Sequence, residues 1–235
     1  HFALLQTGRP GRAKYWWQRR RSRRTELAFN DHDGQVRLVY RDNHEHQTDI
    51  EEVYLQVLRS AQRRVVIANA YFFPGYRLLR EIRNAARRGV EVRLILQGQP
   101  DMMIAKLAAR MLYDYLLKAG VTIYEYCERP LHGKVALVDE DWSTVGSSNL
   151  DPLSLSLNLE ANVLIRDRAF NRELFERLDH LSRTHCTIMP ENHAPRGLLW
   201  RMTIGFMVFH FLRHFPAWAG WLPAHKPRLK PFSPP

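Results

Sequence analysis

The sequence has few cysteines, few acidic residues and few long apolar runs, and each shortage limits what the protein can be. Its two cysteines, Cys127 and Cys186, have no metal-binding or redox spacing, which favours a reducing compartment. Lysine and arginine outnumber aspartate and glutamate by 35 to 24, so the chain has a net charge of +11. An anionic partner is therefore expected, and charge alone does not choose between nucleic acid and an anionic lipid surface.

The sequence also lacks a group of His, Cys, Asp and Glu at the spacing of metal ligands, so neither a metal nor a cofactor is expected. We expect no signal peptide, because the N-terminal run HFALL is too short and lacks the flanking residues of one. The first residue is His1, and we expect the sequence to be cut from a longer protein.

One dense motif stands between His132 and Asn149. Lys134 lies two residues after His132, Asp139 follows after four more residues, and a Gly-Ser-Ser-Asn run ends the motif. If each residue type occurs at roughly 5%, a chance match in this chain has odds on the order of one in a million. The motif therefore decides the class of reaction.

These residue types suit transfer of a phosphodiester. A neutral histidine can attack phosphorus, and a second, protonated histidine can donate a proton to the leaving oxygen. On a strand over 133–138, His132 and Lys134 share one face, so the ammonium can bind phosphate oxygens beside the imidazole. Ser147 and Asn149, near the end of the next expected strand, offer neutral donors to the same oxygens, and lysine supplies the positive charge that a metal would otherwise bring.

The motif resembles the HKD signature of the phospholipase D superfamily, whose members work through a phosphohistidine. The resemblance implies that Glu160, 28 residues beyond His132, hydrogen-bonds the imidazole and fixes its tautomer. Asp139 is the aspartate of the HKD signature, although it is equally suited to ordering the turn after the strand. The superfamily builds one site from two motifs. We therefore expect a second HKD half, either a missing N-terminal half or a second copy of this chain.

Residues 47–188 further resemble bacterial cardiolipin synthases. This resemblance implies a phosphatidyltransferase that makes cardiolipin from phosphatidylglycerol, an anionic phospholipid, at the cytoplasmic side of the bacterial inner membrane. Tyr71, Phe72 and Phe73 follow a strand, and we expect them to line a substrate channel; a buried aromatic cluster is the alternative. Two other functions stay open: a homodimeric HKD nuclease or phosphodiesterase, and a non-catalytic membrane-binding fragment. Nucleic acid is the less expected partner, because the C-terminal segment is apolar.

Strands alternate with helices from Gln35 onward, which predicts an α/β fold: a mixed, mainly parallel twisted sheet with helices on both faces. Thr48 and Glu51 form a capping-box pattern at the start of the first helix. This phospholipase D-like half-domain covers 35–188, with its HKD region at 127–154. The expected strands are 36–40, 64–70, 90–96, 121–126, 133–138 and 159–165, and the expected helices are 48–61, 76–88, 101–120 and 170–181.

The two ends of the chain differ from this regular middle. Residues 1–34 contain the run WWQRRRSRR and are expected to be a basic linker or the remnant of a preceding half. Residues 197–223 are apolar and flanked by tryptophans, but their longest uncharged run falls well short of the ~20 residues that span a bilayer. We expect them to form a membrane-interface helix, and 224–235 to form a disordered tail.

Overall fold

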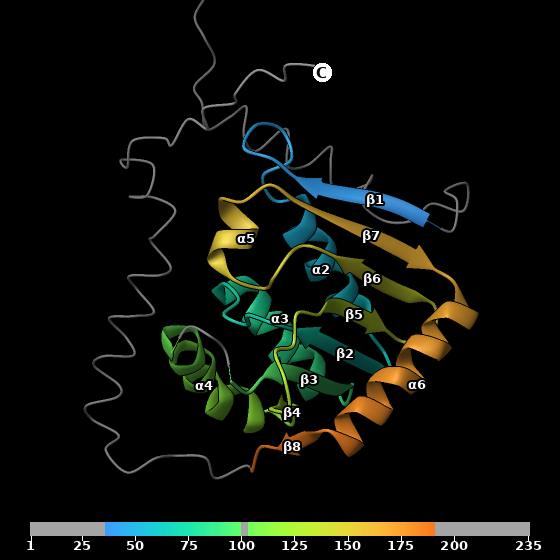
Figure 1. Ribbon diagram of the computed structural model, residues 1–235. Coiled ribbons are helices and arrows are strands. Elements are labelled where there is room, and N and C mark those ends of the chain that lie inside the picture. The colour runs from blue at the N-terminus through green and yellow to red at the C-terminus, as the bar shows by residue number, and fades with distance from the viewer. Residues whose placement is uncertain (1–35, 100–102, 191–235) are drawn as a thin grey trace, which may run out of the picture.

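The computed structural model describes residues 36–99 and 103–190, which build one eight-stranded sheet in the order β1-β7-β6-β5-β2-β3-β4-β8 (Figure 1). The strands are β1 (Val36–Arg41), β2 (Arg64–Asn69), β3 (Glu91–Gln97), β4 (Thr122–Tyr126), β5 (Lys134–Val138), β6 (Trp142–Gly146), β7 (Glu160–Arg166) and β8 (Cys186–Ile188). The helices are α2 (Asp49–Ser60), α3 (Tyr76–Arg87), α4 (Met103–Leu117), α5 (Pro152–Ser156) and α6 (Arg168–Thr184).

The expectation of a mainly parallel sheet is wrong. Only β2, β3 and β4 run parallel, and every other neighbouring pair is antiparallel. The parallel strands are those separated by α3 and α4, because a parallel return needs a long crossover. The connection between β5 and β6 is a short turn, and such a turn can join only antiparallel strands.

Helices cover both faces of the sheet, as expected. The larger core lies between the sheet and α2, α3 and α4, and contains fully buried side chains such as Leu55, Leu78 and Leu116. A smaller core lies on the opposite face, where Leu178 of α6 packs with Val66 and Leu137. Figure 1 shows α6 crossing in front of the sheet while α2 and α3 lie behind it.

Local sequence signals explain most element ends. Gly89 and Gly120, which follow α3 and α4, both have a φ of +90°, a conformation that suits glycine at a helix C-terminus. Asp151 and Asp167 accept backbone hydrogen bonds at the starts of α5 and α6. Thr48 is the N-cap of α2 but its side chain makes no capping hydrogen bond, so the expected capping box does not form.

Two short elements have no counterpart in the sequence expectations, namely α5 and β8. The sequence positions 1–34, 197–223 and 224–235, for which a linker, an interface helix and a tail were predicted, lie outside the described residues. Among the helices that the structure does describe, none combines the length and apolar character needed to cross a bilayer.

Candidate active site

All motif residues except Asp139 gather at one end of the sheet, where the parallel strands have their carboxyl ends. His132 lies in the loop before β5, and Ala70, just after β2, donates a backbone hydrogen bond to Gly133 at 3.0 Å. The antiparallel register places Asn69 opposite Lys134, so the start of β5 lies beside the end of β2. Open α/β sheets bind ligands at this end of their strands, which makes it the expected place for a substrate.

His132 and Lys134 lie in contact, as their spacing predicts. The ammonium Nζ lies 3.2 Å from the imidazole Nε2 and donates to the His132 carbonyl oxygen at 3.3 Å. His132 is exposed, whereas Lys134 is buried. Burial lowers the pKa of Lys134, while the nearby carboxylates of Glu160 and Asp151 act in the opposite direction. An exposed imidazole beside a buried cation can reach a phosphorus atom while the cation binds its oxygens.

Glu160 also lies at this end of the sheet, but it does not make the expected contact. Its Oε2 accepts a hydrogen bond from the Ser147 hydroxyl, and its Oε1 accepts one from the Asn158 amide at 3.4 Å. Within the described residues, no hydrogen bond joins Glu160 to His132. The carboxylate therefore orients Ser147 in this chain, while the imidazole Nε2 has Lys134 as its neighbour.

Ser147 and Asn149 lie on the loop between β6 and α5, close to the other motif residues. The Ser147 hydroxyl accepts from the Ala161 backbone amide at 3.0 Å, which ties the loop to β7. Oδ1 of Asn149 is buried without a hydrogen-bond partner in the described part of the chain. A buried amide oxygen normally has a partner, so this atom remains available to a substrate donor.

The structure does not bring Asp139 to this site. Asp139 follows the far end of β5, roughly 16 Å from Lys134 along a strand that rises about 3.3 Å per residue. Its carboxylate accepts hydrogen bonds from the backbone amides of Gln62, Arg63 and Arg64. The turn-ordering role, left open by the sequence, matches these contacts.

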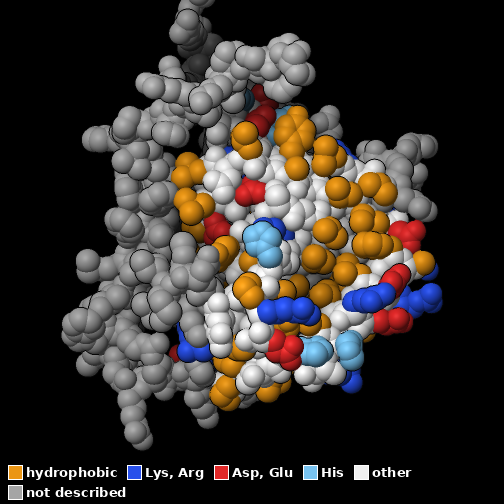
Figure 2. All heavy atoms as spheres, in the orientation of Figure 1, with side chains coloured by type: hydrophobic (Ala, Val, Ile, Leu, Met, Phe, Trp, Pro, Cys, Tyr) orange, Lys and Arg blue, Asp and Glu red, His pale blue; other side chains and the backbone are white. Residues whose placement is uncertain are grey.

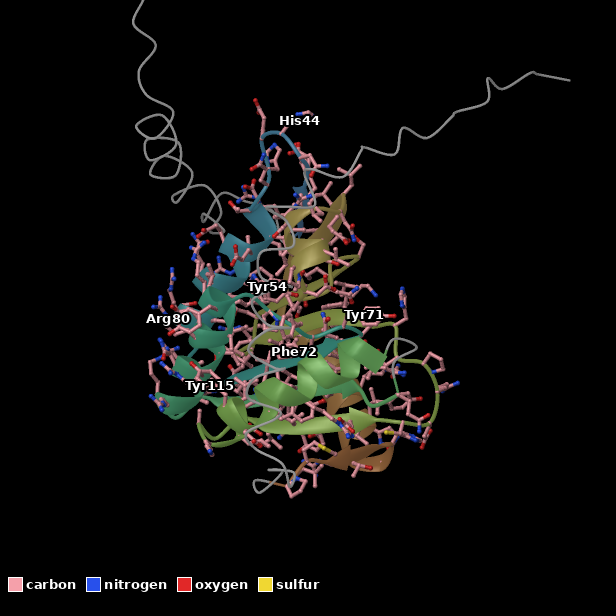
Figure 3. The ribbon with its side chains drawn as sticks, turned by 90° about the vertical axis from the view of Figure 1, so that its left-hand side faces the viewer. His44, Tyr54, Tyr71, Phe72, Arg80 and Tyr115 are labelled. Carbon is pink, nitrogen blue, oxygen red and sulfur yellow. The ribbon has the colours of Figure 1, made fainter. Side chains whose placement is uncertain are left out.

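The aromatic run divides between the core and the site. Phe72 and Phe73 are only 3% and 6% exposed and belong to the main hydrophobic core, so the expected substrate channel is wrong for these two residues. Phe72 forms a β-bridge with Leu150, and Figure 3 shows it in the interior of the molecule. Tyr71 keeps partial exposure. Phe72 and Phe73 anchor the loop after Asn149, because Phe73 also donates its backbone N–H to the Leu150 carbonyl at 2.8 Å.

Two asparagines that sequence reasoning missed support the motif loop from below. Asn69 is fully buried and its Oδ1 accepts from the Leu150 amide at 3.2 Å. Asn162 accepts from the Ser148 amide at 3.3 Å, and a side chain on Gly146 would overlap its carboxamide. The glycine of the motif thus leaves room for Asn162. Both asparagines lie within expected strands, and only the register shows that they face the motif.

The described residues hold no group of three or more His, Cys, Asp and Glu side chains placed to bind a metal ion. What they do hold is one imidazole, one ammonium, a serine hydroxyl and an asparagine amide at one sheet end. This set can bind a phosphodiester and supply one of the two proton-transfer or nucleophilic groups that its cleavage needs. The second such group is not among these four described side chains.

Comparison with known proteins agrees with this chemistry. Residues 54–182 match the family described as cardiolipin synthase, PLD-like domain. Cardiolipin synthase B of Escherichia coli is 56% identical over 223 residues, an alignment that covers 95% of this chain and 54% of that protein. Cardiolipin synthase 2 of Bacillus cereus is 36% identical over 146 residues, covering 62% of this chain and 28% of that protein. The chain thus spans about half the length of the first of these relatives.

Two solved structures share the fold at low sequence identity. The phospholipase D family member Nuc from Salmonella typhimurium has a TM-score of 0.56 and 20% identity, covering 66% of this chain and 97% of Nuc. The phosphatidylserine synthase of Haemophilus influenzae has a TM-score of 0.57 and 18% identity, covering 88% of this chain and 54% of that protein. At these identities the likeness shows the fold alone.

Proposed function

Because the chain belongs to the family of cardiolipin synthase PLD-like domains, we propose that it supplies one half of a phosphatidyltransferase site that makes cardiolipin from phosphatidylglycerol. The observation that carries the proposal is the pair of His132 and Lys134, 3.2 Å apart, in a chain 56% identical to a cardiolipin synthase B. The site residues are His132 and Lys134 as the reactive pair, Asn149 as a phosphate ligand through its side-chain amide, and Glu160 with Ser147 as the pair that fixes the motif loop. Ser147 was expected to bind phosphate as well, but its hydroxyl donates its one proton to Glu160.

The reaction needs two histidines in sequence. One imidazole attacks the phosphorus of phosphatidylglycerol and forms a P–N bond, while the P–O bond to the glycerol headgroup breaks. The leaving alkoxide takes a proton from the second, protonated imidazole and departs as glycerol. The hydroxyl of a second phosphatidylglycerol then attacks phosphorus and gives its proton to that second imidazole. The P–N bond breaks, the first imidazole is free again, and cardiolipin is released.

Lys134 contributes through charge rather than through proton transfer. Its ammonium lies beside the imidazole, where it neutralises negative charge that builds up on the non-bridging phosphate oxygens in the transition state. His132 can serve as either of the two imidazoles, because both roles need the same lysine neighbour. The other imidazole belongs to the second HKD half.

An exposed apolar sheet face supports this partner. Val36, Leu38 and Tyr40 point outward from β1 with exposures of 63%, 61% and 42%, and Val145 of β6 is 38% exposed. Figure 2 shows such side chains gathered over this side of the molecule, and of the described helices only α6 covers part of the same face. A contiguous apolar surface of this kind marks an interface.

This face continues into the site. Val145 lies on β6 two residues before Ser147. Ser147 follows the strand and continues its pairing, because its amide donates to the Ala161 carbonyl of β7 at 2.9 Å, so the two side chains share a face. A second half docked on the apolar face would therefore meet the open side of the motif loop. The relatives have the length for such a half, since the chain covers 54% of the E. coli protein.

We further propose that the protein acts at the surface of the bacterial inner membrane, on its cytoplasmic side. The lipid substrate and the net charge of +11 support this location, because basic proteins bind anionic bilayers. The apolar segment 197–223, whose sequence suits an interfacial helix, is the proposed anchor. Flotation with phosphatidylglycerol liposomes should decrease when the chain is truncated after Asn192.

The decisive experiment compares this chain with a chain extended at its N-terminus to the length of its relatives. Labelled phosphatidylglycerol should yield cardiolipin with the longer protein, while the 235-residue chain alone should be nearly inactive. Turnover by the short chain that rises with the square of its concentration would instead favour a homodimer. Full turnover by a monomeric short chain would contradict the half-site. Absence of cardiolipin from the longer protein would contradict the transferase assignment.

A further inference from the structure

Arg41 is a buried cation next to the candidate site that the catalytic motif does not include. It is the last residue of β1 and only 4% of its surface is exposed. The antiparallel register pairs it directly with Glu160 of β7. We propose that Arg41 is a positioning residue that holds Glu160, and through Ser147 the motif loop that carries Asn149, in place for phosphate binding; this inference rests on the proposed function.

The guanidinium of Arg41 is occupied by backbone oxygens at the end of α5. It donates to the carbonyl groups of Ser156 and Asn158, and to the Asn43 side chain at 3.0 Å. A planar guanidinium can reach two carbonyl groups at once, which a lysine ammonium on a flexible stem does less well. Arg41 therefore fixes the short connection between α5 and β7.

This connection carries the next contact toward the site. The Asn158 side-chain amide donates to Oε1 of Glu160 at 3.4 Å, and the Ser147 hydroxyl donates to Oε2. Both oxygens of the carboxylate are thus held, one from the connection and one from the motif loop. Arg41 holds the backbone of Asn158, so its loss should free the carboxylate to move and leave Ser147 without a fixed acceptor.

Charge acts in the same direction as geometry. Burial lowers the pKa of Arg41, and the neighbouring carboxylates of Asp42 and Glu160 oppose that effect. A buried cation needs anionic partners. Glu160 on the paired strand and Asp42 at the start of the following turn supply them. The turn after β1 is itself fixed, because Asp42 accepts the backbone amides of His44 and His46 at 2.9 and 2.8 Å.

The test uses the chain extended to the length of its relatives, with Arg41→Met, Arg41→Lys and Glu160→Gln. Methionine keeps the apolar stem but removes charge and donors, whereas lysine keeps the charge. Arg41→Met should lower kcat by about 10- to 100-fold with little change in KM, because small misplacements of this kind cost up to about 100-fold. Arg41→Lys should recover part of that loss. Arg166→Met, which removes an exposed arginine from the other end of β7, is the matched control and should leave kcat unchanged.

A double-mutant cycle separates positioning from general stability. If Arg41 acts through Glu160, the pair Arg41→Met and Glu160→Gln should be no slower than Glu160→Gln alone. Equal kcat in Arg41→Met and wild type, or multiplicative losses in the double variant, would overturn the proposal. Thermal melting of each variant sets the assay temperature below its transition, and Arg41→Lys carries the test if the methionine variant does not fold.

Two substrates keep this inference distinct from the proposed function. Each variant is assayed with phosphatidylglycerol and with the chromogenic diester bis(p-nitrophenyl) phosphate, which reports phosphodiester cleavage without a lipid. If the wild type cleaves the diester but makes no cardiolipin, the transferase proposal fails while the Arg41 cycle can still be read. If the wild type makes cardiolipin and the cycle is additive, only the Arg41 proposal fails.

Discussion

Asp139 offers the sharpest separation between a catalytic and a structural reading of the motif. Its carboxylate accepts the Arg63 amide at 2.8 Å and the Arg64 and Gln62 amides at 3.1 Å, so it holds the start of β2. Its φ is +53°, in the left-handed region that asparagine and aspartate tolerate better than alanine. Asp139→Ala should therefore lose a shared acceptor and also gain backbone strain.

The size of the effect follows from these two contributions. Leaving backbone donors without their acceptor costs about 1–3 kcal/mol, here reduced because the site is partly exposed to water. The left-handed backbone adds about 1 kcal/mol for alanine. A total of about 2–3 kcal/mol lowers Tm by roughly 4–12 °C in a chain of this size. Asp139→Asn keeps one acceptor oxygen and the tolerance for positive φ, so its Tm should fall by less.

Calorimetry and turnover should be measured on the same preparations of the chain extended to the length of its relatives. Below the melting transition, both variants should keep kcat within about threefold of wild type, because Asp139 lies far from Lys134. The control is Asp141→Ala. Asp141 lies on the same turn as Asp139, and its loss removes only the partly exposed partner of Arg166, so Tm and kcat should change little. A variant with an unchanged Tm and a kcat reduced more than about 100-fold would refute the structural reading.

The remaining predictions concern the reactive pair, the core and the cysteines. His132→Ala in the chain extended to the length of its relatives should abolish transfer, and Lys134→Ala should lower it by about 10²–10⁴-fold, measured as cardiolipin formed per minute; a folded His132→Ala protein that keeps activity would contradict the assignment. Burial lowers the pKa of Lys134 in the folded state, so the unfolded state binds the proton more tightly. Wild type should therefore have a lower free energy of unfolding than Lys134→Met while Lys134 is charged. This difference should shrink as pH rises through the folded-state pKa toward 10.5, and a difference that grows with pH would contradict the prediction. Phe72→Ala should cost about 3–5 kcal/mol in urea unfolding, and a change below about 1 kcal/mol would place the ring outside the core. Cys186, whose pKa burial raises to about 11, should react with dithionitrobenzoate at pH 8 more slowly than the exposed Cys127.

Much of the fold was predictable because its signals are local. Residues 65–68 form a continuous apolar run between Arg64 and Asn69, and this segment was correctly assigned to a buried strand. The helix over 76–87 ends at a glycine with positive φ, as its sequence indicated. The direction of the strands was not predictable in the same way, because it depends on which strands pair. A short apolar strand has the same kind of sequence whether its neighbour runs parallel or antiparallel.

The site shows the same division between near and distant partners. The spacing of His132 and Lys134 predicted that both side chains lie together, since residues two apart in an extended chain share a face. His132 lies just before β5 and Lys134 begins it, and the two side chains are in contact. Asp139 is close to them in sequence, yet the rise of β5 carries it to the other end of the sheet. A separation of two residues, between His132 and Lys134, therefore predicted a real contact. The separation of five residues between Lys134 and Asp139 did not.

The sequence by itself determined the proposed class of chemistry, because an imidazole, a cation and their polar neighbours occur at a spacing that local backbone geometry converts into one cluster. Only the tertiary structure decided what surrounds that cluster. The pairing of β1 with β7 brings Arg41 beside Glu160, and the bridge from Phe72 to Leu150 draws the aromatic residues into the core. These contacts join segments that are far apart in the chain, and their energies depend on burial and register, which no local pattern of residue types records.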